Sequence, residues 1–194
     1  MVEPREDLPP RVVPDPGTVG VAVYDATCLF SKHGRYLLLG FAVHGVVLAR
    51  WSRRLLEETA ANLAGQLRGD SLEDLGRWLK TEADLVRDGL VEGYERWLDH
   101  VDLPDPDDRH VLAAAIECGA TTIVTGNRRD FPDDRLDPIG ITAVEPDEFG
   151  LACIDANPVV AARIVTDHPK PVAFLERLAA TLPRTARYLS DLTT

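Results

Sequence analysis

Short apolar runs alternate along this chain with longer stretches in which apolar residues recur at helical spacing. Four runs rich in β-branched residues predict buried strands; they are VGVAVYD (19–25), VVLAR (46–50), TTIVTG (121–126) and ITAVEP (141–146). Helical spacing occurs in four stretches, which are about 31 to 44, 53–67, from Ser71 toward Gly89, and RHVLAAAIECG (109–119). Strands that alternate with helices predict an α/β fold with a parallel sheet and right-handed crossovers.

Turn and cap residues mark several boundaries of these elements. Gly45 interrupts the first helical stretch, and Ser52 is suited to cap the helix that begins at residue 53. Gly119 is suited to end the helix that precedes it. The segment VEGYERWLDHV (91–101) fits a strand and a short helix equally well.

The chain divides into three regions by composition. Residues 1–18 are rich in proline and charge, which predicts a flexible tail, and residues 19–150 hold the alternating α/β pattern. Residues 151–194 predict two or three short proline-bounded helices, a small C-terminal helical extension that acts either as a lid completing the core or as an oligomer or partner surface. Six of its apolar residues are expected to face inward: Val159, Ile164, Phe174, Leu175, Leu178 and Leu182.

Composition indicates a soluble globular protein. Hydrophobic residues make up 45% of the chain and charged residues 27%, which is typical of a domain that buries a core. No apolar run reaches the roughly 18–20 residues that cross a bilayer, and the N-terminus lacks a signal-peptide core. The odd, unmatched cysteines Cys28, Cys118 and Cys153 predict free thiols in a reducing cytoplasm and disfavour a zinc site.

The net charge narrows the classes of partner. A formal charge of −11 argues against a protein that coats nucleic acid, because such binding needs a basic face. Basic residues nevertheless cluster locally, at Arg50, Arg53 and Arg54 and again at Arg128 and Arg129. A nuclease that engages its substrate through local patches therefore remains compatible with the sequence.

Four acidic residues stand where apolar elements end: Asp25, Glu58, Asp108 and Asp130. Carboxylates at the carboxyl ends of strands, or on the first turn of the following helix, point into the crevice where α/β sheets bind ligands. Several carboxylates that converge there repel one another unless a cation neutralises them, and hard ions such as Mg²⁺ or Mn²⁺ prefer oxygen ligands. The pattern predicts metal-dependent phosphodiester chemistry, in which the ions activate water and stabilise the leaving oxygen.

Each acidic position also has a structural explanation. Asp25 could be a solvated acid at a strand end, Asp108 a helix N-cap, and Asp130 part of a turn with Phe131. Asp105 and Asp107 fit turn formers in the Pro-Asp-Pro-Asp sequence better than ligands.

Neighbouring residues leave similar choices. Glu58, rather than the adjacent Glu57, is expected at the site because it lies three residues after Leu55, on the apolar side of its helix. Thr125 could orient a carboxylate or simply end a strand, and His110 fits packing or capping better than catalysis.

The order of these motifs resembles the PIN-domain ribonucleases, in particular the VapC-type toxins of bacterial toxin–antitoxin pairs. The stretches that carry the resemblance are VAVYDATCLF, ARWSRRLLEETAANL, LPDPDDRHVLAAAIECGATTIVTGNRRDFP and ITAVEPDEF. They cover most of residues 19–150, and 151–194 is similar to the C-terminal extension of one PIN subgroup. The resemblance implies a PIN-like parallel sheet flanked by helices.

The same resemblance implies roles for individual residues. Asp25 matches the acid that ligates metal directly, Glu58 the acid on the helix after the second strand, and Asp108 the acid that opens the DRHVLAAA helix. The chain departs from the commoner pattern at Asn127, where many members carry aspartate, and supplies a carboxylate at Asp130 instead. Four further residues are candidates for contact with substrate: Arg109, Arg128, Arg129 and Thr125.

The implied activity is that of a Mg²⁺- or Mn²⁺-dependent endoribonuclease, the toxin of a toxin–antitoxin pair. Its implied partners are an RNA substrate, a cognate antitoxin protein and a second copy of the chain in a homodimer. The alternative is a catalytically silent PIN-fold module that binds RNA or protein. A phosphatase- or flap-nuclease-like enzyme that acts on DNA is a further rival, disfavoured because the chain has no extended basic arm.

Overall fold

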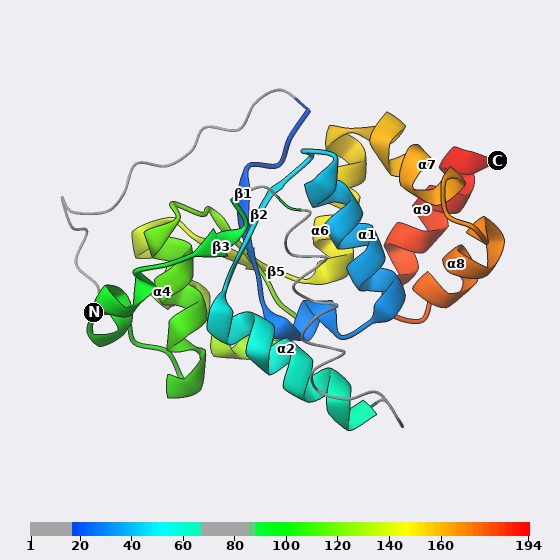
Figure 1. Cartoon of the computed structure of the whole chain (residues 1–194). Coiled ribbons are helices and arrows are strands. Elements are labelled where there is room, and N and C mark those ends of the chain that lie inside the picture. Colours follow the sequence, from blue (N-terminus) through cyan, green and yellow to red (C-terminus); the bar gives the residue numbers. More distant parts are fainter. Residues whose placement is uncertain (1–16, 67–85, 87) are drawn as a thin grey trace.

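One parallel sheet forms the centre of the protein (Figure 1). The computed structural model describes residues 17–66, 86 and 88–194. The sheet has five strands in the order β3-β2-β1-β4-β5, with the bounds β1 Val21–Tyr24, β2 Leu48–Ser52, β3 Leu90–Val91, β4 Thr122–Val124 and β5 Thr142–Val144. Every pair of neighbours is parallel. The predicted α/β class with a parallel sheet is confirmed.

Helices cover both faces of this sheet. The α-helices are α1 Lys32–Val43, α2 Arg53–Gln66, α4 Arg109–Glu117, α5 Asp133–Leu136, α6 Pro146–Ala156, α7 Pro158–Thr166, α8 Pro171–Leu178 and α9 Pro183–Thr193. Short 3₁₀ helices are η1 Ala26–Leu29, η2 Tyr94–His100, η3 Pro106–Asp108, η4 Arg128–Asp130 and η5 Asp137–Ile139. Helix α4 lies on one side of the sheet, and α1 and α6 lie on the other (Figure 1).

Most predicted boundaries are confirmed. The Ser52 hydroxyl accepts a hydrogen bond from Leu55 N (3.2 Å), which is the expected cap at the start of α2. Gly45 and Gly119 follow α1 and α4 with φ of +74° and +65°, the left-handed backbone that favours glycine after a helix. Strand β2 starts at Leu48 rather than at residue 46.

One predicted segment combines a strand with a helix, and two others lie mostly outside the described residues. The ambiguous segment 91–101 contains both options, because Leu90–Val91 is a two-residue strand and Tyr94–His100 is a 3₁₀ helix. The tail predicted over residues 1–18 and the helix predicted from Ser71 toward Gly89 lie mostly in residues 1–16 and 67–85, outside the described residues.

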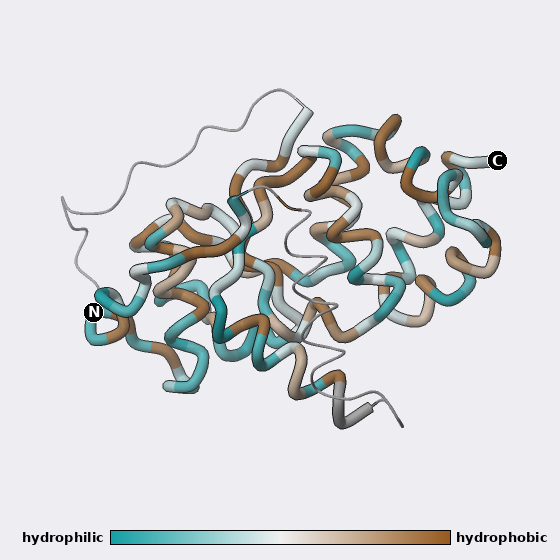
Figure 2. The backbone as a smooth tube through the Cα atoms, viewed as in Figure 1, coloured by the Kyte–Doolittle hydropathy of each residue, from teal (hydrophilic) through white to brown (hydrophobic). Residues whose placement is uncertain are grey.

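The C-terminal helices share their core with the sheet. Among the described residues, a single cluster of buried apolar side chains extends from β1 to α9, and Figure 2 shows hydrophobic residues recurring along α1, α6 and the later helices. Five of the six residues expected to face inward are buried or partly buried, namely Ile164, Phe174, Leu175, Leu178 and Leu182. The arrangement favours a helical layer that completes the core.

The inward position predicted for Val159 is wrong, since its side chain is 77% exposed. Helix α7 buries Ala161, Ile164 and Val165. Val159 lies two residues before Ala161 and therefore on the opposite side of the helix. Helix α6 crosses residue 150, and the boundary between the α/β region and the extension stays a prediction.

Asp147 ties α6 to α9. Its carboxylate oxygens accept hydrogen bonds from the backbone N–H groups of Arg184 (3.1 Å) and Thr185 (2.9 Å), in the first turn of α9. The Thr185 hydroxyl donates to Asp147 O (2.9 Å). The helices approach closely here, because a Cβ at Gly150 would lie 2.6 Å from Thr185 Oγ1. A carboxylate from another helix thus satisfies the N–H groups that α9 leaves unpaired.

The three cysteines are free thiols, as predicted. Burial raises the pKa of the half-buried Cys118 to about 11 and raises the pKa of Cys153 further, so both thiols stay protonated at neutral pH. In the part of the chain that the structure describes, no single helix is long and apolar enough to cross a membrane. Helices α6 and α7 pass that test of length and composition only as a pair, which is bent by 111°.

Replacing Asp147 with alanine should lower the free energy of unfolding by about 1–2 kcal/mol, because α9 loses its cap and its link to α6. Urea denaturation of the full chain measures this difference. The matched control is Asp155→Ala on the exposed side of α6, which should change stability by less than about 0.5 kcal/mol. Equal effects of the two substitutions would contradict the capping role.

Candidate metal centre

Asp25 stands at the carboxyl end of β1 and is held from three directions. Its Oδ1 accepts a hydrogen bond from Ala26 N (2.8 Å), and its Oδ2 accepts from the hydroxyls of Thr27 (2.6 Å) and Thr125 (2.8 Å). The residue is only 5% exposed. A carboxylate has about four lone-pair sites, so these three bonds fix its orientation and leave capacity on Oδ1.

The two hydroxyls connect the ends of neighbouring strands. Thr27 Oγ1 accepts from Gly126 N (2.9 Å), and Thr125 Oγ1 accepts from Asn127 N (3.0 Å). The loop after β4 is thereby tied to the carboxylate that follows β1. Thr125 is fully buried, so its contact is with Asp25 and it offers no surface to a substrate.

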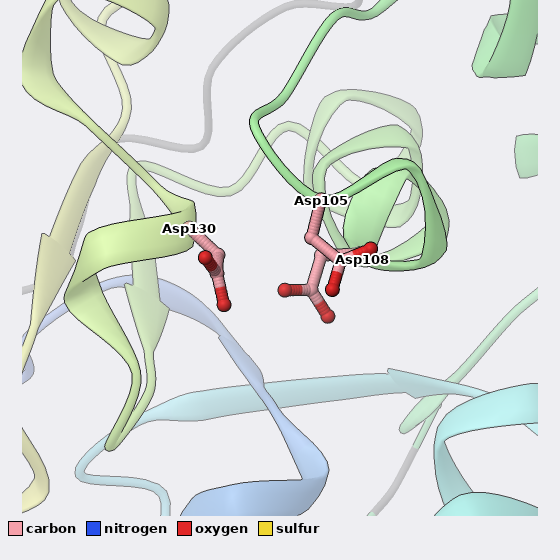
Figure 3. Close-up of side chains that lie close together, drawn as sticks. All are labelled: Asp105, Asp108 and Asp130. Atoms are coloured by element: carbon pink, nitrogen blue, oxygen red, sulfur yellow. The ribbon is translucent and has the colours of Figure 1, made fainter.

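Three aspartates from two separate segments meet across the end of the sheet (Figure 3). Asp105 and Asp108 belong to the turn before α4, and Asp130 belongs to η4. One carboxylate oxygen of each lies within 4.8 Å of the other two. Asp105 also accepts from Asp107 N (2.9 Å), which confirms its role in the turn. Asp108 makes no side-chain cap bond with α4, so capping does not explain it.

Burial and electrostatic repulsion act together on Asp108. Burial first, and then the nearby charges of Asp25, Asp130 and Asp105, raise the pKa of this carboxyl group to about 7. Within the described ranges, none of these four carboxylates has a lysine or arginine as an ion-pair partner. Four acids with hard oxygen donors and no compensating side chain fit a divalent cation.

Glu58 lies beside this group but has its own partners. Arg54 Nε lies 2.9 Å from Glu58 Oε1 within α2, and His110 Nε2 of α4 lies 3.2 Å from the same oxygen. Burial raises the pKa of Glu58, which Arg54 partly offsets, while Asp25 and Asp107 raise it again. Glu58 is therefore close enough to Asp25 for their charges to interact. It does not belong to the group formed by Asp105, Asp108 and Asp130, whose carboxylate oxygens lie within 4.8 Å of one another.

His110 packs beside Glu58, which fits the packing role predicted for it. It is 1% exposed, and burial followed by the charge of Arg54 lowers its pKa to about 4. A neutral imidazole thus lies against Glu58 from the first turn of α4. Arg54 reaches the same region, because its Nη2 donates to Asp107 O (3.2 Å). Glu58 is positioned by α2 and α4 together.

The loop after β4 carries the remaining candidates. Asn127 was expected to offer its amide oxygen to metal or phosphate; in the structure its Nδ2 donates to Asp130 Oδ2. Arg128 lies 3.7 Å from Asp133, and Arg109 lies 3.4 Å from Asp102. Arg129 is exposed. Both Arg109 and Arg128 are therefore paired with acids outside the cluster.

Comparison with known proteins agrees with this geometry. A sequence model of the PIN domain matches residues 22–129, more than half of the chain, and the match includes Asp25, Glu58, Asp105 and Asp108. The chain belongs to the PIN-domain family. The expected membership is confirmed, and helices α6–α9 lie outside the matched PIN residues.

One curated relative adds a name. Over 48 residues the chain is 54% identical to the protein called "Putative ribonuclease VapC50" of Mycobacterium tuberculosis (strain ATCC 25618 / H37Rv). This stretch covers 25% of the chain and 28% of the relative. No solved structure matches the chain significantly.

The metal-free protein should lose stability through Asp108 as pH rises from about 4 to about 7. The folded chain binds this proton more tightly than the unfolded chain, whose aspartates have pKa values near 3.9, so ionisation opposes folding across that window. Asp108→Asn should therefore match wild-type stability near pH 4 and exceed it near pH 8 by about 1 kcal/mol, less than the full shift because the group is partly solvated.

Urea denaturation in EDTA at the two pH values measures this difference. Asp107→Asn is the control, because the Asp107 side chain is 93% exposed. A wild-type advantage over Asp108→Asn at high pH would contradict the account.

Proposed function

We propose that this PIN-domain protein is a Mg²⁺- or Mn²⁺-dependent endoribonuclease that hydrolyses RNA phosphodiester bonds. The observation that carries the proposal is the convergence of Asp105, Asp108 and Asp130 within 4.8 Å, with Asp25 close enough to raise the pKa of Asp108 and, among the described residues, no lysine or arginine paired with any of them. An inactive domain has no use for like charges held this close, because their repulsion opposes folding. Family membership and the ribonuclease name of the relative support the same activity.

The metal ligands are proposed to be Asp25, Asp108 and Asp130, with Glu58 and Asn127 completing the site. A bound ion would supply an activated water and neutralise charge on the phosphate. Asp105 is an additional ligand candidate on the strength of its position. Asn127 would have to turn its amide oxygen toward the ion, since its nitrogen now faces Asp130.

The chain's own side chains position this ligand set. Thr27 and Thr125 fix the rotamer of Asp25, while Arg54 and His110 hold Glu58. A carboxylate that is already oriented loses less conformational entropy when it binds an ion. The exposed Arg128 and Arg129 precede Asp130 directly, where they can contact a substrate phosphate.

The proposed context is a bacterial toxin–antitoxin pair in a reducing cytoplasm. The relative carries the VapC name, but the matched stretch covers only 28% of its length. A cognate antitoxin that places an arginine or lysine among the carboxylates would displace the ion electrostatically. A homodimer, and a division into residues 19–150 and 151–194, belong to the same proposal. The second candidate is a PIN-fold module that binds RNA or protein without cutting.

Asp25→Asn should lower RNA cleavage in Mg²⁺ by at least about 100-fold while the fold is retained, because a ligand charge is lost with almost no change in volume. Cleavage of a labelled single-stranded RNA by purified full-length protein measures the effect. Asp99→Asn, on the exposed side of η2, is the matched control and should cut at the wild-type rate. Wild-type activity in Asp25→Asn would remove Asp25 from the site.

Metal exchange tests the second half of the proposal. Mg²⁺ and Mn²⁺ should support cleavage, whereas Ca²⁺ should bind and support little, because its longer bonds and looser geometry position water poorly. EDTA should abolish activity, and added Mn²⁺ should restore it. Equal rates in Ca²⁺ and Mg²⁺, or activity that survives EDTA, would show that the chemistry is not centred on a metal. No cleavage in any metal would favour the non-catalytic module.

A further inference from the structure

A cavity of about 300 Å³ lies between the N-terminal half of α1 and helix α8. Its wall combines basic and aromatic side chains from segments far apart in the sequence. Helix α1 contributes Lys32, His33 and Tyr36, the turn before α8 contributes His168 and Lys170, and α8 contributes Phe174 and Arg177. The proposed metal centre contains none of these residues.

Positive charge in this cavity has no internal counter-charge. No carboxylate lines it, and across the described residues Lys32, Lys170 and Arg177 make no ion pair. By contrast Arg163 on α7 is paired with Asp167 at 3.2 Å. Three such cations in a chain of net charge −11 favour an anionic ligand.

Two of the cations, Arg177 and Lys32, are also close enough to His33 to affect its protonation. Burial lowers the pKa of His33, and the charges of Arg177 and Lys32 lower it further. Like charges gathered around one hollow cost free energy until an anion enters. The cavity therefore has the electrostatic character of a phosphate site.

Aromatic rings line the same hollow. His168 stacks on Phe174 with centroids 4.7 Å apart and planes at 26°, and Tyr36 meets both rings edge-on at 4.9 Å and 5.4 Å. Tyr36 is 41% exposed, so part of its ring is free for a ligand. Lys170 N donates to His168 Nδ1 (3.1 Å), which leaves Nε2 as a possible donor. Cations beside exposed ring surfaces are the means by which proteins bind single-stranded nucleic acid.

The cavity is within reach of the carboxylate centre along the chain. Lys32 begins α1 only seven residues after Asp25, which limits their Cα separation to at most about 25 Å. The start of α1 is also fastened to the extension, because Ser31 Oγ lies 3.0 Å from Thr181 Oγ1. One strand of RNA can therefore span both places.

We propose that this cavity binds one nucleotide of the single-stranded RNA that the carboxylate centre cuts. Its phosphate is held by Lys32, Lys170 and Arg177, and its base packs against Tyr36 and His168. The inference rests on the proposed function for its substrate class, but it requires binding and not cleavage. The C-terminal extension thereby becomes part of the RNA-binding surface.

Fluorescence anisotropy of the full chain in EDTA, with a labelled unstructured RNA, tests the proposal without catalysis. Arg177→Glu should weaken RNA binding about tenfold and reduce the salt dependence of log Kd by about one unit of slope. Arg163→Glu makes the same charge change on α7, outside the cavity, and should leave the affinity within about twofold. Tyr36→Leu should also weaken binding, because stacking is lost.

The possible outcomes separate the alternatives. Equal weakening by Arg177→Glu and Arg163→Glu, or no RNA binding by the wild-type chain, would overturn the proposal. If adenosine monophosphate or inorganic phosphate binds as tightly as the RNA and depends equally on Arg177, the ligand is a free anion and the RNA assignment is wrong. Because Arg177 is exposed, its variant should fold, and Lys170→Gln supplies a second test of milder charge change.

Failure of the proposed nuclease activity gives a different pattern. If the protein cuts no RNA in Mg²⁺ but binds RNA in a way that depends on Arg177, the proposed binding cavity is supported and the proposed nuclease activity is wrong. If wild type and Arg177→Glu cut RNA with the same KM, the proposed catalytic centre is supported and the proposed RNA-binding role of the cavity is wrong.

Discussion

Repulsion among carboxylates at the carboxyl edge of the parallel sheet is the constraint on which the rest of this structure depends. Asp25, Asp108 and Asp130 come from a strand end, a helix start and a loop, and after burial the charges of Asp25 and Asp130 are the largest causes that raise the pKa of Asp108. Hydrogen bonds between the ends of neighbouring strands hold the carboxylates in place against this repulsion. The hydroxyls of Thr27 and Thr125 bind Asp25 and also receive N–H groups from the loop after β4. The fold thus holds a charge arrangement that a divalent cation would stabilise.

The same reasoning explains how an acidic protein could act on RNA. Net charge is −11, yet Lys32, Lys170 and Arg177, which form no ion pair with any described residue, line one cavity beside α1 and α8. Association with a polyanion depends on such local fields more than on total charge. In the proposed account, one surface attracts phosphate while another binds metal. The layer of α6–α9 would then contribute to RNA binding as well as to the hydrophobic core.

Much of the fold could be predicted from the sequence, because each element carries local signals. β-branched runs predicted β1, β4 and β5, and Ser52 and Gly119 marked helix ends through interactions confined to a few residues. Val159 was misplaced because a proline-initiated helix of nine residues allows more than one inward face. Which side chains of α7 are buried depends on the helices that pack against it, and the sequence of α7 alone does not specify them.

The candidate site was only partly predictable. Asp25, Asp108 and Asp130 could be named because strand and helix ends collect at one edge, although their roles stay predictions. Asp105 was read only as a turn former, a role it does have, and its approach to Asp130 depends on how two distant loops pack. The cationic cavity left no local signal at all, since Lys32 and Arg177 belong to helices from opposite ends of the chain.

Crystallography of the full chain soaked with Mn²⁺ is the most direct test of the account. An anomalous peak should lie among Asp25, Asp108 and Asp130, with carboxylate oxygens about 2.1–2.2 Å away. The Asp108 carboxyl group should then be ionised, because the cation offsets the burial and the repulsion that together raise its pKa to about 7. An ordered crystal with saturating Mn²⁺ and no peak at these residues would contradict the claim that their repulsion exists to be neutralised by a metal.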